Sequence, residues 1–385
     1  PPYGPPPYGP PPYGPPPYGP PPYGQPPYGW PGPPPGAPPY AAPVPPYGAP
    51  PSPRRELPPY PHAQPEPYHR ILCTWTYRWW RVLVGVLGTV LLGLLVGPLL
   101  ALLVVSVGVE VLGIGSAGEL VEGLQLRGEL TPATLLVVNL SLAALIPITW
   151  LAVRVLHNLR PRWLGSVRPG LRWGLLGRCF GVAVLATLLS VAVAGVLLPE
   201  ELPTGDAGSA AQSAGTTAAY LVIIALTSPL QSAGEEYFFR GYLLQGFGAL
   251  VRARWFALVC TSLLFAVAHG AQNLPLFVDR FAFGLVAGGL VMFTGGLEAG
   301  IAMHIVNNVV VLGLAAATGA LPQALGSTEA SWSLVVFDLG QFVVYALLVA
   351  WMFRRGGATA LTAGPPTADA HPAGSAAGPT ASGTA

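Results

Sequence analysis

The chain has 385 residues, and only 9% of them are Asp, Glu, Lys or Arg, against about a quarter in an ordinary soluble domain. Hydrophobic residues make up 52%, and the formal net charge of +2 gives no basic surplus that would indicate a nucleic-acid partner. The composition therefore excludes a soluble globular protein and a nucleic-acid-binding protein, and it indicates a protein whose main partner is the lipid bilayer.

Both ends of the chain are predicted to be disordered. The first 30 residues are six near-copies of PPYGP, and a Pro- and Gly-rich tract continues from there. Such segments cannot bury a core, so we expect disorder over 1–69 and, for the Ala/Gly/Pro/Thr-rich tail, over 356–385. The repeat is either a solvated linker, the interpretation we favour, or a segment that binds a partner. Because the chain begins without Met, we expect residues to precede it.

Eight hydrophobic segments lie between the tails, within 70–355. A bilayer core of roughly 30 Å needs about 20 apolar residues of helix to cross it. The segments run over 82–109, 132–153, 179–198, 218–245, 255–269, 281–297, 299–318 and 332–353. We therefore predict an all-α, polytopic transmembrane helix bundle of about eight helices, with seven or nine if a short segment is re-entrant.

The charges of the connecting loops alternate in sign. Arginines precede the first segment, fill the loop over 154–178 and follow the fourth and eighth segments. The loops after the first and third segments are mainly acidic. Because arginine accumulates on the cytoplasmic side, this pattern predicts an even number of crossings and a multi-pass protein of the cell membrane with both termini in the cytoplasm. All 18 basic residues are Arg, which we interpret as a bacterial genome bias.

Three of the predicted helices carry polar residues at membrane depth, where such residues mark function by default. The fourth segment contains Glu235 and Glu236 in GEEYFFRGYLLQ, the fifth ends in FAVAHG at His269, and the seventh contains AMHIVNN, with His304 and Asn308. At about 1.5 Å per residue these side chains fall at intermediate depth, within reach of one another if the helices bundle.

The two glutamates have different expected partners. Glu236 and Arg240 are four residues apart and can form an ion pair on one helix face. We give equal weight to a pair that only fixes the packing of the helices and to one that supports a functional site. Glu235 points about 100° away, so it needs a partner on another helix. We favour a functional carboxylate at Glu235 over a second structural one.

This set of residues is sufficient for peptide hydrolysis. A carboxylate and a histidine can activate a water molecule, and a second histidine with an amide can stabilise the oxyanion. The alternative is zinc held by Glu235, His269 and His304, the ligand types of several metalloproteases. Against zinc, the sequence has no HExxH and the histidines lie on different helices. We therefore favour direct water activation without a cofactor.

The three motifs GEEYFFR, FAVAH and HIVNN, in this order on successive hydrophobic segments, resemble those of the CPBP intramembrane protease family, also called Abi or type II CAAX-protease-like. The resemblance covers about 179–318, which we take as the protease core. It implies an all-helical fold with a cavity open to the cytoplasm, and an intramembrane endopeptidase that cleaves a membrane-associated protein or peptide.

The resemblance also implies a role for each residue. It makes Glu235 the water-activating base with His269 as its partner, and it makes His304 and Asn308 the pair that stabilises the oxyanion. Glu236 and Arg240 match the supporting members of the first motif. Two alternatives from other classes remain: a transporter that uses the same polar groups as an ion path, and a non-catalytic scaffold whose PPYGP tail recruits partners.

Overall fold

The computed structural model describes residues 61–62, 64–124, 130–201, 213–357 and 359–363. These residues form α-helices joined by short helical turns and loops, and they contain no β-strand. The predicted all-α class is confirmed. The PPYGP repeat and most of both tails lie outside the described residues.

Seven helical segments of the described part are long and apolar enough to cross a membrane. They are α1 (Trp79–Leu112), α3 with α4 (Pro132–Ala143 and Leu145–Leu156), α5 (Trp173–Leu197), α6 continuing into η5 and α7 (Ala214–Glu236, Tyr237–Leu243 and Leu244–Leu250), α9 (Leu274–Thr294), α10 (Glu298–Ala317) and α12 (Trp332–Arg355). The eighth predicted segment is the shorter apolar helix α8 (Arg254–Ala268), of 15 residues. Each predicted segment thus falls on one helix or on consecutive helical pieces.

The predicted boundaries differ most at the sixth segment. Helix α9 begins at Leu274, seven residues before the predicted start, because Asn273 caps it by accepting a hydrogen bond from the Leu276 backbone N–H. Asp279 and Arg280 interrupt the apolar run there, and the hydropathy pattern alone therefore placed the helix start after them. These two extra turns, at 3.6 residues per turn, include Arg280 in the helix.

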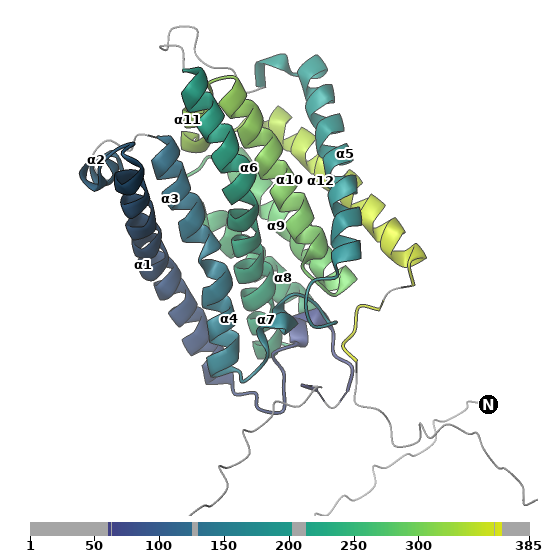
Figure 1. Ribbon diagram of the computed structural model, residues 1–385. Helices are drawn as coiled ribbons and strands as arrows, with labels where there is room; N and C mark the ends of the chain where they lie inside the picture. The colour runs from purple at the N-terminus through teal and green to yellow at the C-terminus, as the bar shows by residue number, and fades with distance from the viewer. Residues whose placement is uncertain (1–60, 63, 125–129, 202–212, 358, 364–385) are drawn as a thin grey trace, which may run out of the picture. The chain divides into compact units, whose positions relative to one another are not determined.

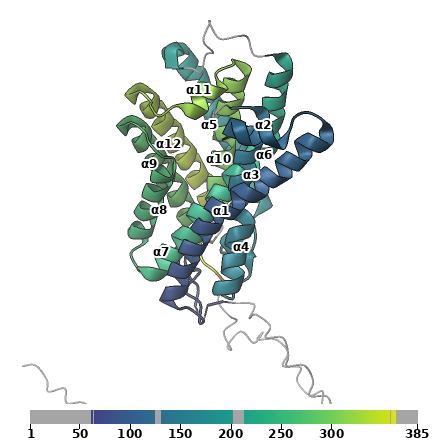
Figure 2. The same ribbon diagram turned by 90° about the vertical axis from the view of Figure 1, so that its left-hand side faces the viewer.

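Helix α10 lies between α6 on one side and α5 on the other, with α9 also packed against it (Figure 1). Helix α3 covers the opposite side of α6 and α1 packs against α3, while α8, α9 and α12 form the far side of the bundle (Figure 2). The helices with the predicted site residues, α6, α8 and α10, therefore come together with α9. Short helices α2 (Ala117–Glu122) and α11 (Leu321–Gly326) lie at the end opposite the start of α1.

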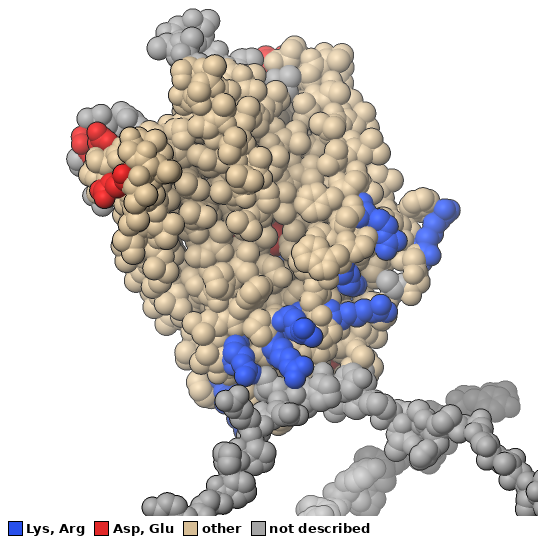
Figure 3. Space-filling view, in the orientation of Figure 1, with Lys and Arg blue, Asp and Glu red and all other residues tan. Residues whose placement is uncertain are grey.

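The charged side chains separate toward the two ends of the bundle. Arginines gather at the end where α1 begins and α12 finishes, while the acidic side chains of α2 lie at the other end (Figure 3). Exposed Trp79, Trp173 and Trp351 lie at the arginine-rich end, as expected where a helix meets the bilayer surface. The start of α1 and the end of α12 thus share the end that carries the basic loops.

The structured region extends a few residues beyond both predicted tail boundaries. Tyr68, in the turn η1 (Tyr68–Arg70), is fully buried, and its hydroxyl donates a hydrogen bond to the Leu164 carbonyl. Pro67 pairs with Leu361 in an isolated antiparallel bridge. The aromatic Tyr68 side chain is buried in this packing, which a composition dominated by Pro conceals.

The segment before the site is fixed by a close approach between α6 and α3. A side chain at Gly234 would collide with the carbonyl oxygen of Leu142, at the end of α3. This glycine therefore lets the two helix backbones touch one residue before Glu235.

We predict that Gly234→Ala destabilises the protein by about 1 to 3 kcal/mol, because the added methyl group meets backbone and not a flexible side chain. Gly181→Ala in α5 is the matched control, since nothing lies within 4 Å of its Cβ position. That change should stabilise the helix by up to about 1 kcal/mol. Thermal unfolding in detergent measures both, and equal stability of the two variants would contradict the predicted contact.

Candidate active site

Glu235 lies in the last turn of α6 and is 6% exposed. Its Oε1 accepts a hydrogen bond of 2.6 Å from the Gln231 side-chain amide, one turn earlier on the same face. Its Oε2 has no hydrogen-bond partner among the described residues and lies 3.7 Å from Nε2 of His304. One carboxylate oxygen is thus held, and the other is left for a further group.

Glu236 is fully buried and has protein partners on two elements. Nη1 of Arg240 donates to its Oε1 at 2.9 Å, and Nδ1 of His304 lies 2.9 Å from the same oxygen. The predicted pair between Glu236 and Arg240 is present, and it also binds α10 through His304. Because Cβ at Gly300 would lie 2.6 Å from Oε2 of Glu236, a glycine on α10 makes room for this carboxylate.

Arg240 is 1% exposed and lies in the π-helical turn η5. Its Cζ is 4.0 Å from the ring centroid of Phe265 and 5.5 Å from that of Phe283, so the cation lies against two aromatic rings. Phe283 also contacts His304, with the ring centroids 5.0 Å apart. These rings from α8 and α9 seal the ion pair from solvent. The π turn places Arg240 against them, and such turns are frequent at functional sites.

His269 forms the C-cap of α8, and its Nδ1 lies 2.8 Å from the carbonyl oxygen of Phe265. That oxygen is an acceptor, so Nδ1 carries the proton and Nε2 is free to accept. His269 is exposed, and its ring centroid lies 4.7 Å from that of Phe265, which in turn lies 5.9 Å from that of His304. It is therefore the accessible histidine of the cluster, while His304 is 4% exposed.

Asn308 lies one turn after His304 on α10 and is half-buried. Its Nδ2 donates to Oε1 of Gln231 and to Oγ of Ser232, each at 3.2 Å. Neighbouring Asn307 points to another helix, where its Oδ1 lies 3.5 Å from the Gln341 amide on α12. The structure thus brings Asn308, and not Asn307, to the Glu235 side of α10.

All six predicted site residues therefore belong to one cluster of four packed elements. Gln231 and Ser232 belong to it too, although sequence reasoning passed over them. A signal existed, because Gln231 lies four residues before Glu235 and so shares its helix face. The aromatic cover by Phe283 had no such signal, since a Phe in an apolar helix is unremarkable by sequence.

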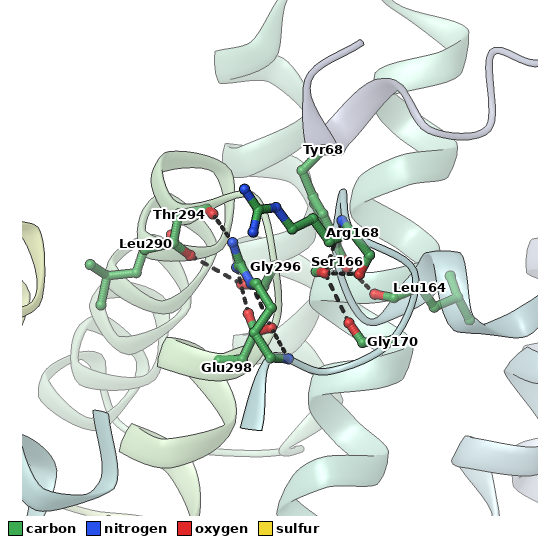
Figure 4. Close-up of polar contacts among 10 residues, drawn as sticks. Tyr68, Leu164, Ser166, Arg168, Gly170, Leu290, Thr294, Gly296 and Glu298 are labelled. Atoms are coloured by element: carbon green, nitrogen blue, oxygen red, sulfur yellow. Dashed lines mark hydrogen bonds and ion pairs between the residues drawn. The ribbon is translucent and has the colours of Figure 1, made fainter. Parts of the chain in front are cut away.

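The start of α10 is held by a second buried ion pair, 6 residues and about 9 Å before His304. Glu298 is fully buried and accepts three hydrogen bonds from Arg172, two to Oε1 at 2.7 and 2.9 Å and one to Oε2 at 2.7 Å (Figure 4). Nη1 of Arg172 also donates to the Thr294 carbonyl at 2.9 Å. The loop before α5 therefore fixes the turn between α9 and α10.

Three histidines outside the spanning segments are structural. Burial lowers the pKa of His62, His69 and His157, in the last case to about 4, so they stay neutral near pH 7. Nε2 of His157 lies 3.0 Å from the Tyr242 hydroxyl. Within the residues described here, no three His, Cys, Asp or Glu side chains come together in a group that could hold a metal ion. The zinc alternative stays a prediction.

The fold and the cluster together define a multi-pass helical membrane protein with a carboxylate, histidine and amide site at bilayer depth. A family model described as "Type II CAAX prenyl endopeptidase Rce1-like" matches residues 216–310, which include all six predicted site residues. The match falls on the family that the resemblance in the three motifs predicts.

The chain is also 27% identical over 170 residues to the "Uncharacterized protein YyaK" of Bacillus subtilis (strain 168). The match covers 43% of this chain, and it spans 55% of the length of YyaK. No solved structure matches the chain significantly.

We predict that Arg240→Gln costs about 3 to 5 kcal/mol of stability, because it leaves the Glu236 carboxylate buried without its cation. The double change Glu236→Gln with Arg240→Gln should cost clearly less than the sum of the two single changes, since it removes both charges. Thermal unfolding of the four proteins tests this coupling. Additive losses would show that the two side chains do not depend on each other.

Proposed function

We propose that this protein is an intramembrane endopeptidase, which hydrolyses a peptide bond of a membrane-associated protein or peptide with water activated by Glu235 and His269. The observation that carries the proposal is the position of Oε2 of Glu235, a buried oxygen without a hydrogen-bond partner that lies 3.7 Å from Nε2 of His304. Oε2 of Glu236 also lacks a partner, but its carboxylate is already paired with Arg240. A buried acceptor without a partner is costly, so its retention at membrane depth favours a functional group. The match to an Rce1-like family model supports the same class of reaction.

The proposed mechanism begins with water between Glu235 and His269. Oε2 of Glu235 takes a proton as the water oxygen forms a bond to the peptide carbonyl carbon. The carbonyl oxygen becomes an oxyanion, which accepts hydrogen bonds from Nε2 of His304, when that nitrogen is protonated, and from the Asn308 amide, which exchanges its bond to Gln231 or Ser232 for one to the oxyanion. The proton then passes to the leaving nitrogen, the C–N bond breaks, and a carboxylic acid and an amine are released.

Glu236 and Arg240 support this reaction without touching the substrate. Their ion pair leaves Glu236 occupied, so the two adjacent glutamates take different tasks. The hydrogen bond between Glu236 and Nδ1 of His304 fixes the ring of that histidine and directs its Nε2 to the Glu235 side. This division of roles agrees with the polar partners that each carboxylate has.

We further propose that both termini face the cytoplasm of a bacterial cell membrane, since the arginines gather at the end where α1 begins and α12 finishes. The substrate is a peptide or protein of that membrane, and no nucleic acid takes part. The PPYGP repeat is a candidate segment for a further partner.

We predict that Glu235→Ala and His269→Ala each lower cleavage by about 10²- to 10⁴-fold, as expected for loss of a general base or its partner, while the fold is kept. The measurement compares membrane-peptide profiles of cells carrying wild type or either variant, with thermal unfolding as the check on folding. Asn307→Ala is the control, because Asn307 points away from Glu235.

Unchanged peptide profiles in both variants would exclude the protease and favour a transporter or scaffold. Adding a chelator to cells that carry the wild type distinguishes direct water activation from zinc-dependent hydrolysis. Cleavage that persists with the chelator supports direct activation by Glu235, and loss that zinc restores would assign Glu235, His269 and His304 as metal ligands.

We also predict that Gln231→Leu lowers kcat by about 10- to 100-fold with little change in KM, because Glu235 loses the donor that orients it. The Gln231 amide has only one consistent orientation: Asn308 and Ser232 donate to its oxygen, so its NH₂ group must face Glu235. Since Gln231 acts through Glu235, Gln231→Leu should have no further effect in a Glu235→Ala background. An equal loss in both backgrounds would contradict this.

A further inference from the structure

The loop between α4 and α5 carries three exposed cations at the arginine-rich end of the bundle, where we expect the bilayer surface. Arg160, Arg162 and Arg168 are all exposed. Among the described residues, none of their guanidinium groups donates a hydrogen bond or forms an ion pair with another side chain. The nearby carboxylate of Glu298 is buried and already occupied by Arg172. The positive charge of this loop is therefore not compensated within the described part of the protein.

The backbone of this loop is held in one conformation. The Gly170 N–H donates to the Arg162 carbonyl at 2.7 Å, and the Trp163 N–H donates to the Arg160 carbonyl at 3.0 Å. The Ser166 hydroxyl donates to the carbonyls of Arg168 and Gly170 (Figure 4). Gly170 has φ +104°, which a residue with a side chain rarely adopts. The cations thus extend from a fixed backbone, and a ligand that binds them need not order the loop.

The loop lies where lipid headgroups are expected. It joins two membrane-spanning segments, and exposed Trp150 and Trp173 flank it on the two helices. A guanidinium group matches the geometry of a phosphate, and near an anionic leaflet each such cation contributes about 1 kcal/mol to binding. An anionic phospholipid therefore fits both the charge and the place of the loop.

The same loop is bonded to the turn before α10. The Val167 N–H donates to the Gly295 carbonyl at 2.8 Å, and the Leu297 N–H donates to the Gly165 carbonyl at 2.9 Å. Arg172 adds its bonds to Glu298, the first residue of α10. Any ligand that holds the loop therefore also holds the start of the helix that carries His304 and Asn308.

We propose that Arg160, Arg162 and Arg168 bind the phosphates of anionic phospholipid headgroups, and that the lipid-bound loop stabilises the start of α10. The site then depends on the lipid composition of its membrane. This regulation of cleavage rests on the proposed protease function, whereas lipid binding and its effect on α10 do not.

The test uses the full chain in nanodiscs of phosphatidylcholine alone or of phosphatidylcholine mixed with phosphatidylglycerol. Hydrogen exchange of the amides over 298–304 reports on the start of α10. Phosphatidylglycerol should slow this exchange by about tenfold when its concentration is ten times the Kd, because a ligand of the native state suppresses opening by that factor. The triple variant Arg160→Gln/Arg162→Gln/Arg168→Gln should lose the slowing.

The control variant Arg252→Gln/Arg354→Gln/Arg355→Gln removes three exposed arginines from the same end of the bundle and should keep the slowing. Equal hydrogen exchange in the two lipid mixtures would overturn the proposal. If both triple variants lost the slowing to the same extent, the effect would be one of general charge, and the proposal would also fail. Equal slowing by soluble glycerol phosphate would also overturn the assignment to lipid. If the Glu235→Ala experiment shows that the protein is not a protease, the hydrogen-exchange measurement still decides whether lipid binds to the loop.

Discussion

The buried interaction of Glu236 with Arg240 and His304 is the constraint on which the site depends. Two full charges at membrane depth are tolerated only when each has a partner, and here the partners come from η5 and α10. The aromatic rings of Phe265 and Phe283 then exclude water from the cation. Because a shift of α10 against α6 would separate His304 from Glu236, this contact fixes the two helices that carry Glu235 and Asn308.

The ion pair between Arg172 and Glu298 also fixes α10, at the arginine-rich end of the bundle. Arg172 and Glu298 fix the first residue of α10 to the loop before α5, and the Glu236 contact fixes His304 two turns later. A helix held at two points along its length has little freedom to rotate or slide. The amide of Asn308, one turn further on, therefore reaches Gln231 and Ser232 without a strong contact of its own.

The sequence predicted the helix segments well because an apolar run that crosses a bilayer leaves few other structures open to it. It also predicted the pairing of Glu236 with Arg240, since a spacing of four residues on a helix determines that contact. It could not predict the contact of His304 with Glu236, or the capping position of His269, because these depend on how helices pack. Likewise, the apolar pattern placed the start of α9 too late, since Asp279 and Arg280 are polar residues inside a helix that is buried only in part.

Accessibility across the cluster follows the division of labour between the two glutamates. Glu236 and Arg240 are sealed, Glu235 and His304 are nearly so, and His269 and Asn308 are the members with accessible surface. The exclusion of solvent around Glu236 and Arg240 strengthens their ion pair, because charges interact more strongly in a low-dielectric environment. In the proposed mechanism, water and the peptide approach Glu235 from this accessible side, where His269 and Asn308 lie. A single pair of adjacent carboxylates can thus contribute one structural and one reactive group, since the burial and the partners of each side chain set its role.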